Sequence, residues 1–471
     1  MIPGNHHEIL RPAENLDEVY WTLQPSPLTS KPQLKAFYRE ELNEVRGEDV
    51  VDRLDRRLVQ SLGRSPYKAF LVGQPGSGKS TEISRLAERI EARYRTLRLS
   101  AAQEVNPTTF QPFDILLLIL FRLADAMKEV FQEYPRQETI PEPLLEDALR
   151  FFGDESKSTK SSQERDLHAE ASAGAGFPKL WASFLSFRAE AGSKIKVGYQ
   201  QETHLVQYRF ATLGALTDLT NRFVTECDRL LERLDQRRWL IVVEDFDRYG
   251  MADEQLRRVL IEYGGLFRQL NISLLFTIPA WLGYSQDAEK LPFERDHLFL
   301  ITDTPVYLRN HEPDERGRAS LRAVMDARVK RDLFEGRSLE MLIVASGGNL
   351  RDLFAMARDS SDRAVLRKAE KIGEPDAKKA ILKTLQEYRS RLGSSTEEPS
   401  ALAYEDLKTK LLQVYKDEAA SRVPDATLYA LLRSRAVLHF DGDGWFGVHP
   451  LVVDVLRDQG VLPVDAKGGT I

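Results

Sequence analysis

Hydrophobic and polar positions follow two different periods along this 471-residue chain. Short apolar runs predict five buried strands, at 68–72, 96–101, 239–243, 272–278 and 297–302. Between them, apolar residues recur at three- and four-residue steps, which predicts amphipathic helices over 36–62, 80–94, 113–134, 213–234 and 253–270. Strands that alternate with helices are typical of a parallel sheet covered on both faces. We therefore expect an α/β fold with three layers.

The pattern changes on both sides of this core and once within it. Residues 1–35 are rich in proline and polar residues without periodicity, so we expect an arm with little structure of its own. Residues 153–204 are polar and rich in serine and glycine, which predicts a flexible insert with a short ordered "FPKLWASFLSF". Near the end, two β-prone runs flank Gly-Asp-Gly, the pattern of a hairpin. The predicted units are an arm at 1–35, an α/β core at 36–308, a helical lid at 309–392, a winged-helix module at 402–460 and a tail at 461–471.

One predicted strand-to-helix junction carries a glycine-rich loop. "GQPGSGKS" at 73–80 fits GxxxxGK[ST] and lies between a buried strand and the start of a helix. Backbone N–H groups of such a loop bind phosphate together with the positive end of the helix dipole. Lys79 is expected to reach the β- and γ-phosphates, and Ser80 to bind Mg²⁺. The predicted nucleotide-binding residues of this P-loop are Gly73, Pro75, Gly76, Ser77, Gly78, Lys79, Ser80 and Thr81.

A second junction, "WLIVVEDFDRYG" at 239–250, gathers charge directly after a buried strand. A P-loop that hydrolyses its nucleotide needs a carboxylate for Mg²⁺ and a group that orients water. One strand register places Glu244 on the metal side and Asp245 beside the water. A register one residue later makes Asp245 the metal-side acid, because neighbouring side chains of a strand face opposite ways. Both registers stay open, as does the alternative that these acids only solvate a strand end.

Two further strand ends offer polar groups. Thr277 comes at the tip of the strand after the acids, where its hydroxyl could touch the attacking water or the γ-phosphate. Arg295 precedes the last core strand, and we consider it an arginine finger directed at a neighbouring subunit. Arg248 and Arg268 are its rivals for that role.

The segment "GGNLRDLF" at 347–354 predicts a helix start with Asn349 as its N-cap. Arg351 then stands in the first turn, where a cation is unfavourable unless an anion lies nearby. A γ-phosphate would supply that anion. The alternative is an ordinary ion pair with Asp352 or Asp359.

Composition limits the partners. The formal net charge of -6 gives no overall attraction to nucleic acid or to acidic lipid. Cys227 is the single cysteine, which excludes an internal disulfide and fits a reducing, cytoplasmic compartment. The longest apolar run, Ile115 to Phe121, is far shorter than the roughly 18 residues of a membrane span, so no membrane contact is expected.

In this order, the P-loop, the acidic strand end, Thr277 and Arg351 resemble the AAA+/STAND branch of P-loop ATPases, over about residues 40–460. "YREELNEVRGEDVVDRLDRRL" is similar to the adenine-side helix of origin-recognition-type ATPases, which implies Arg46 and Val50 near the base. "EDFDR" is similar to the acidic motif of STAND and KAP ATPases, and the C-terminal region to a bacterial winged helix. The order Glu244 then Asp245 reverses the AAA+ pattern of Asp then Glu.

The resemblance implies a switch that binds ATP and Mg²⁺, hydrolyses ATP slowly, and couples its nucleotide state to lid movement. Its partner would be a second copy of the chain or a separate effector or sensor, since neither is recognisable within it. Bacterial relatives often serve in conflict or anti-phage systems. Two alternatives remain: a DNA-associated initiator or loader, for which "LLRSRAVLHF" supplies only Arg433 and Arg435, and a scaffold that holds nucleotide without turnover. His449 is interpreted as structural.

Overall fold

The computed structural model of the protein describes residues 9–135, 139–159, 203–248, 250–393, 402–440 and 445–463. Its main sheet has five strands in the order β2-β3-β4-β1-β5, and every pairing is parallel. The strands are β1 Lys68–Gly73, β2 Tyr94–Ser100, β3 Arg238–Glu244, β4 Ser273–Pro279 and β5 Leu298–Ile301. The predicted α/β class is confirmed, and each predicted strand starts and ends within two residues of an observed one.

The parallel register brings the strand ends that precede the predicted site residues to the same edge of the sheet. The interior strand β1 pairs with β4 and β5, and its last residue, Gly73, lies opposite Pro279 and Ile301. On the other side of β4 in the strand order, Ser100 of β2 lies opposite Glu244 of β3. Because all the strands run in the same direction, their carboxyl ends share this edge, which is where open α/β sheets bind ligands.

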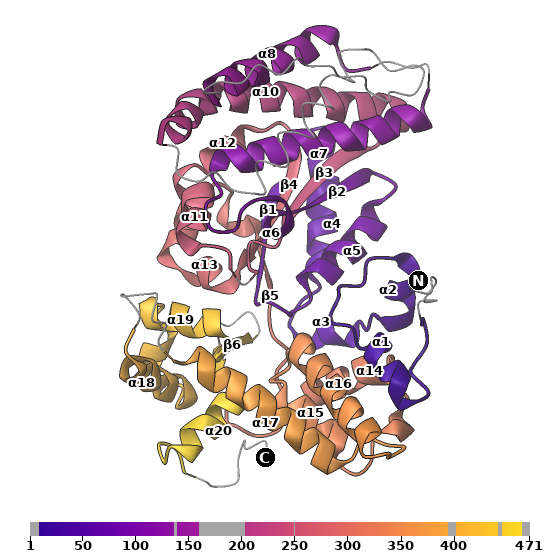
Figure 1. Cartoon of the computed structure of the whole chain (residues 1–471), viewed down its shortest axis with the longest axis vertical. Coiled ribbons are helices and arrows are strands. Elements are labelled where there is room, and N and C mark those ends of the chain that lie inside the picture. The colour runs from indigo at the N-terminus through magenta and orange to yellow at the C-terminus, as the bar shows by residue number, and fades with distance from the viewer. Residues whose placement is uncertain are drawn as a thin grey trace.

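Helices cover both faces of the sheet (Figure 1). On one face, α4 Val50–Ser61 and α5 Lys79–Ile90 pack their apolar residues against Leu240 and Val242 of β3. On the other, α7 Pro112–Glu133 and α10 Thr203–Asp235 lie over the strands, with α8 Glu142–Thr159 outside them. The run at 115–121 is buried throughout, because α7 lies between the sheet and α10. A short α6, Ala101–Glu104, follows β2.

The single helix predicted over 253–270 is wrong in one respect. The segment divides into α11 Asp253–Arg257, a π-helical turn Arg258–Glu262 and α12 Gly265–Gln269. Two adjacent glycines at 264 and 265 interrupt it, and glycine in a helix interior is unfavourable by about 1 kcal/mol relative to alanine. After β4 come α13 Ala280–Tyr284 and two 3₁₀ turns, Gln286–Lys290 and Arg295–His297.

The expectation of little structure over 1–35 is wrong for residues 9–35. They form α1 Leu16–Thr22 and the start of α2 Lys31–Phe37, which is followed by α3 Glu41–Val45. Side-chain caps at Asn15 and Ser30 begin the first two helices, and Leu16 and Val19 are buried. The segment is anchored to the lid, because the Ala13 N–H donates to the Arg328 carbonyl at 2.8 Å.

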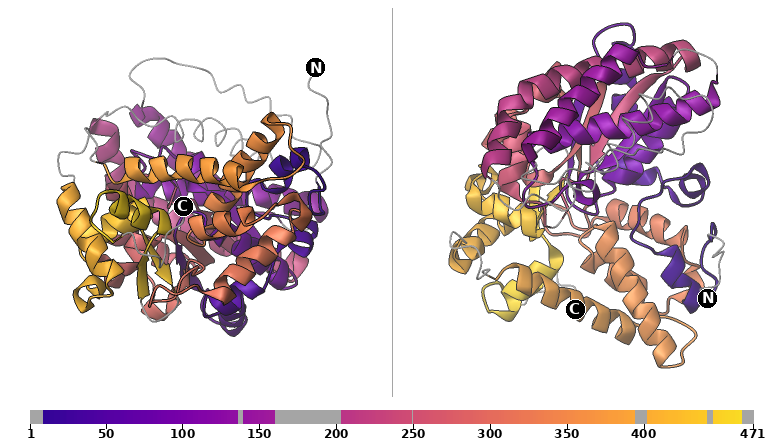
Figure 2. Two further views of the ribbon diagram at one scale, coloured as in Figure 1. Left: turned by 90° about the horizontal axis from the view of Figure 1, so that it is seen from below. Right: turned by 45° about the horizontal axis from the view of Figure 1, so that its top comes forward.

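The chain after β5 is helical and then ends in a small mixed unit. The predicted lid contains α14 Glu315–Asp326, a 3₁₀ turn Arg331–Leu333, α15 Ser338–Ala345, α16 Leu350–Leu366 and α17 Glu374–Arg391. The last unit contains α18 Tyr404–Tyr415, a 3₁₀ turn Ala419–Arg422, α19 Ala426–Ser434, the antiparallel hairpin of β6 Val437–Phe440 and β7 Trp445–Val448, and α20 Pro450–Asp458. The orange lid and the yellow C-terminal unit lie together on one side of the core (Figure 2).

Some predicted features lie outside the described residues: 160–202 of the expected insert with its "FPKLWASFLSF", the hairpin turn at 441–444, and 464–471 of the tail. Within the described ranges, no helix has both the length and the apolar character to cross a membrane.

Candidate nucleotide site

The P-loop has the backbone conformation that its glycines permit. Gly76 and Gly78 have φ angles of +87° and +104°, values that residues with a Cβ rarely adopt. A Cβ at Gly76 would stand 2.6 Å from the Asn349 side-chain oxygen, so the loop is packed directly against the start of α16. A Cβ at Gly73 would stand 2.8 Å from the Ile301 carbonyl, which accounts for glycine where β1 approaches β5.

The loop borders a hollow of about 1090 Å³ at the carboxyl edge of the sheet. Three parts of the chain build it: the core, the N-terminal segment and the lid. The predicted site residues on its wall are Pro75, Gly76, Ser77, Gly78, Lys79, Ser80, Thr81, Asp245, Arg46 and Arg351. Those that do not line it are Gly73, Val50, Glu244, Thr277 and Arg295. Lining residues that the sequence did not suggest are Pro25, Ser26, Pro27, Leu28, Phe37, Tyr38, Arg39, Leu42, Glu82, Asp247, Val324, Arg328, Leu350 and Phe354.

Lys79 is buried and already holds three oxygen partners. Its Nζ donates to the carbonyls of Gly73 and Gln74, each at 2.8 Å, and lies 2.7 Å from the Asp247 carboxylate. Both members of this ion pair are less than a tenth exposed. Sequence reasoning gave Asp247 no role, although it belongs to the same acidic cluster. Its place beside the lysine depends on the turn after β3, which residue spacing does not define.

Glu244 ends β3 on the face that α5 covers. Its carboxylate accepts hydrogen bonds from Nε and Nη2 of Arg98 on the neighbouring strand β2, the second at 2.9 Å. The same guanidinium donates to the Ser84 hydroxyl at 2.7 Å and to the Ser80 carbonyl at 3.3 Å. Glu244 is therefore placed toward the P-loop helix, and a bidentate arginine neutralises it there.

Asp245 turns away from the strand with a φ of +72°, an uncommon value for a residue other than glycine. Its carboxylate accepts hydrogen bonds from the Ser100 hydroxyl and from Arg248 Nε, the latter at 2.8 Å. Its backbone N–H donates to the Thr277 hydroxyl at 3.1 Å. Thr277 thus fixes the backbone of Asp245 and does not itself line the hollow.

The oxygen atoms around the hollow suit a Mg²⁺ ion that waters and phosphates also bind. In the described part of the chain, no cluster of three or more His, Cys, Asp or Glu side chains forms a metal cage. Mg²⁺ usually takes one or two carboxylates together with waters and substrate phosphates. Ser80, Asp245 and Asp247 border the same hollow and supply such a set, whereas Glu244 is engaged by Arg98.

Asn349 is the N-cap of α16, as predicted, and it also contacts the P-loop. The Asn349 side-chain oxygen accepts from the N–H groups of Arg351 and Asp352, at 3.1 and 3.3 Å, and its Nδ2 donates to the Pro75 carbonyl at 3.1 Å. Within the described ranges Arg351 forms no ion pair. Its burial lowers its pKa most, and the nearby positive charge of Arg435 lowers it further.

The alternative acid partners of Arg351 are engaged elsewhere. Asp352 binds Arg435 and Tyr388, and Asp359 binds Arg363 and Lys383. These pairs leave the Arg351 guanidinium on the wall of the hollow.

The remaining predicted residues are more scattered. Arg46 is buried and joins the P-loop to the chain after β5, because Nη1 donates to the Ser77 carbonyl and Nε to the Thr304 hydroxyl, each at 3.0 Å. Val50 lies in the core between α4 and the sheet instead of near the hollow. Arg295 precedes β5 at the amino ends of the strands, is 83% exposed and pairs with Glu289.

The rivals of Arg295 have partners within the chain. Arg248 binds Asp245, and Arg268 donates to the Pro292 carbonyl.

The C-terminal unit contacts the P-loop directly. The Gln74 side-chain amide, within the P-loop, donates to the Val437 carbonyl of β6 at 2.8 Å. Arg435, in the left-handed conformation with a φ of +62°, is buried and binds both Asp352 and Tyr388. His449 caps α20 and stacks on Tyr388 with ring centroids 4.2 Å apart.

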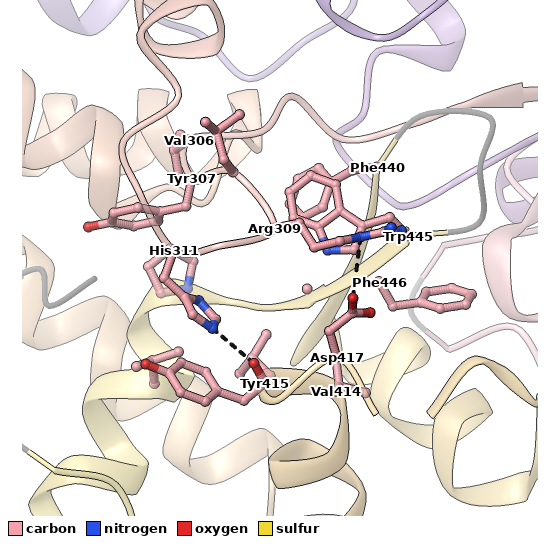
Figure 3. A pocket seen from close by; sticks show the side chains of 15 residues that line it. Val306, Tyr307, Arg309, His311, Val414, Tyr415, Asp417, Phe440, Trp445 and Phe446 are labelled. Carbon is pink, nitrogen blue, oxygen red and sulfur yellow. Dashed lines mark hydrogen bonds and ion pairs between the residues drawn. The ribbon is translucent and has the colours of Figure 1, made fainter. Parts of the chain in front are cut away.

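A second hollow of about 560 Å³ lies between the hairpin and residues 306–311 (Figure 3). Its walls include the aromatic rings of Tyr307, Tyr415, Phe440, Trp445 and Phe446. Arg309 Nε lies 3.6 Å from the Asp417 carboxylate on the same wall. These charges satisfy each other, and the P-loop borders the first hollow and not this one.

No protein-family model and no curated protein sequence matches the chain. Solved structures do. ORC2 of Aeropyrum pernix, in ADPNP–ADP complexes, is 13% identical with a TM-score of 0.41, over 90% of this chain and 100% of that one. Cdc6p from Pyrobaculum aerophilum is 11% identical with a TM-score of 0.38, over 93% and 98%. The Thermotoga maritima RuvB branch-migration motor is 11% identical with a TM-score of 0.32, over 90% and 99%.

Proposed function

We propose that the chain is an ATP-binding switch that uses Mg²⁺, hydrolyses ATP slowly, and conveys the occupancy of its P-loop to the lid and the C-terminal unit. The observation that carries the proposal is the contact of three units on one phosphate loop. The core supplies Lys79, the lid supplies Asn349 and Arg351, and the C-terminal unit contacts Gln74. A phosphate bound in this loop changes the surroundings of all three.

Binding begins with an exchange of partners at Lys79. The P-loop N–H groups and the lysine are positive and face the hollow, while Asp247 occupies the ammonium. A triphosphate carries more negative charge than one carboxylate, so it displaces Asp247 from Lys79. When bound, Mg²⁺ would neutralise phosphate oxygens, and Ser80, Asp245 and the released Asp247 would hold it. Arg351, which lacks an acid partner among the described residues, then neutralises the terminal phosphate.

Slow turnover follows from the way the acids are held. Ser100 and Arg248 occupy the Asp245 carboxylate, and Arg98 occupies that of Glu244. These partners hold both carboxylates in place, so turning either acid toward an attacking water would break one of these contacts. Arg295 is exposed and suits a contact with a second copy of the chain, which would complete the site in an oligomer.

Binding itself is tested at the P-loop lysine. Lys79→Ala removes the cation of the cradle, and we expect calorimetry to detect no ATP binding at concentrations that saturate the wild type. Lys290→Ala, which removes an exposed lysine paired with Asp287, is the matched control and should bind normally. Unchanged ATP affinity in Lys79→Ala would exclude the proposed site.

A scaffold that holds nucleotide without turnover is the second candidate, and the Arg98–Glu244 pair favours it. Phosphate release distinguishes the two functions. If the switch hydrolyses ATP, Asp245→Asn should lower the rate at least tenfold with little change in Tm. Glu244→Gln should mainly lower Tm, because it leaves Arg98 without its buried acid. Wild-type release no faster than that of Lys79→Ala would establish the scaffold.

The DNA-loader alternative has less support. Arg433 pairs with Asp253 and lies over Trp281, and Arg435 is buried against Asp352. The two arginines that the sequence offered for DNA are thus engaged within the chain. Helix α19, which precedes the hairpin, packs against α13 of the core.

A further inference from the structure

The wall of the hollow built by α2, α14 and α16 contains two arginines that lack an acid. Arg328 follows α14 and Arg39 follows α2, and both line the hollow. Neither forms an ion pair with any residue that the structure describes. Burial, followed by the charge of Arg39, lowers the pKa of Arg328 to about 9. Burying a cation without a counter-charge is unfavourable, so an anionic or acceptor-bearing ligand near Arg328 would lower the cost of its burial.

Arg328 is held in a defined orientation. Its guanidinium lies over the rings of Phe37 and Phe354, 5.1 and 4.9 Å from their centroids. Its Nη1 donates to the carbonyls of Phe37 and Val324, at 3.0 and 3.2 Å. Two rings and two carbonyls therefore fix the plane and one edge of the group, which is the arrangement expected of a preorganised binding residue.

The other edge of Arg328 has no protein partner. Within the described part of the chain, neither Nε nor Nη2 of Arg328 makes a hydrogen bond. Both atoms are accessible to solvent, since neither is among the fully buried polar atoms that lack a partner. Arg328 lines the hollow, so these two donors are within reach of a ligand bound there. Guanidinium is a donor only, so its complement is an acceptor atom.

We propose that Arg328 binds the base of the nucleotide, donating from its Nε–H and Nη2–H edge to a ring nitrogen, the only kind of acceptor that adenine presents. The P-loop accounts for the phosphate end of the ligand, and Leu42, Val324 and Phe354 give the wall around Arg328 the apolar surface that suits a flat base. This inference rests on the proposed nucleotide function and adds a base-recognition residue outside the P-loop.

The test separates the base from the phosphates. Arg328→Met keeps an unbranched side chain between the two rings and removes the donors. Calorimetry should show ATP and ADP binding weakened together, by about 10- to 100-fold, the effect of losing a hydrogen bond from a charged group. Binding of tripolyphosphate, which has no base, should stay at the wild-type value. Arg322→Met, on α14 and paired with Glu340, is the matched control and should bind all three ligands normally.

Two results would overturn the assignment. Wild-type ATP and ADP affinity in Arg328→Met would show that the donors do not reach the base. Weakened tripolyphosphate binding would show that the substitution acts through the P-loop or the fold. If Arg328→Met does not fold, as judged by its thermal unfolding, Arg328→Gln is measured by the same criteria. A wild-type protein that binds none of the ligands would overturn the proposed function itself.

Discussion

At the scale of residues, three oxygen atoms share the ammonium group of Lys79 in the P-loop. Lys79 is buried with Asp247 and two backbone carbonyls. Burying an ammonium without such oxygens is strongly unfavourable, so they offset the cost of its burial and align it. The same carboxylate also competes with any incoming phosphate. Asp247 therefore stabilises the buried Lys79 and, under the proposed function, weakens the first step of binding.

Replacing Asp247 with asparagine separates these two effects. In the presence of EDTA, we expect Asp247→Asn to bind ATP about 3- to 30-fold more tightly, because a partly screened negative charge leaves the phosphate site. In excess Mg²⁺ the gain should disappear, since a metal-side carboxylate is lost. Fluorescence titration with a labelled ATP measures both, and Asp296→Asn, an exposed acid paired with Arg57, is the control. Unchanged affinity in EDTA would contradict the competition.

Residue spacing predicted part of this chemistry. The P-loop pattern placed Lys79 and Ser80 on the hollow, and the helix cap placed Arg351 there. The choice between Glu244 and Asp245 stayed open because a strand end can turn in either direction. The structure shows Glu244 toward α5 and Asp245 at a positive φ. Arg328 could not be found from spacing, since its role depends on rings from two distant helices.

At the scale of elements, the join between β5 and the lid contains a fully buried carboxyl. The Asp303 N–H donates to the His439 carbonyl at 2.9 Å, so the join is fastened to the hairpin. Its Oδ1 has no hydrogen-bond partner among the residues described. Burial raises the pKa of Asp303 from its ordinary value of 3.8 to about 6.

This shift predicts how stability depends on pH. The folded chain binds the Asp303 proton more tightly than the unfolded chain, so the contribution is complete below about pH 4 and is lost as pH rises through 6. Asp303→Asn cannot ionise and should be more stable than the wild type at pH 8, by at most about 3 kcal/mol. The difference should shrink as pH falls from 7 to 5, as measured by urea unfolding. A difference that does not vary with pH would contradict the raised pKa.

The elements themselves were predicted unevenly. Buried parallel strands are continuous apolar runs, so all five were found from the pattern. Helices α1 and α2 were missed because each has seven residues, too few to show a helical period. Their capping residues, Asn15 and Ser30, were the available signal.

At the scale of the whole molecule, segments far apart in sequence contact each other at and near the P-loop. Gln74 and Val437 are 363 residues apart, and Asp352 and Arg435 are 83 apart. Single-sequence patterns contain no information on such pairs, because each partner is an ordinary polar residue in its own segment. The contacts nevertheless define a route, since Asp352 follows Arg351 in α16 and Arg435 immediately precedes the hairpin unit.

If nucleotide state travels along this route, removing Arg435 should uncouple the C-terminal unit from the P-loop. In the wild type, we expect ATP to alter hydrogen–deuterium exchange both in peptides of residues 73–80 and in those of 437–440. In Arg435→Met the P-loop peptides should still respond, whereas the hairpin peptides should not, because the buried pair with Asp352 is gone. Arg433→Met removes a neighbouring surface pair and should behave as the wild type. An equal hairpin response in Arg435→Met and the wild type would show that the C-terminal unit is coupled to the P-loop by another path, or not at all.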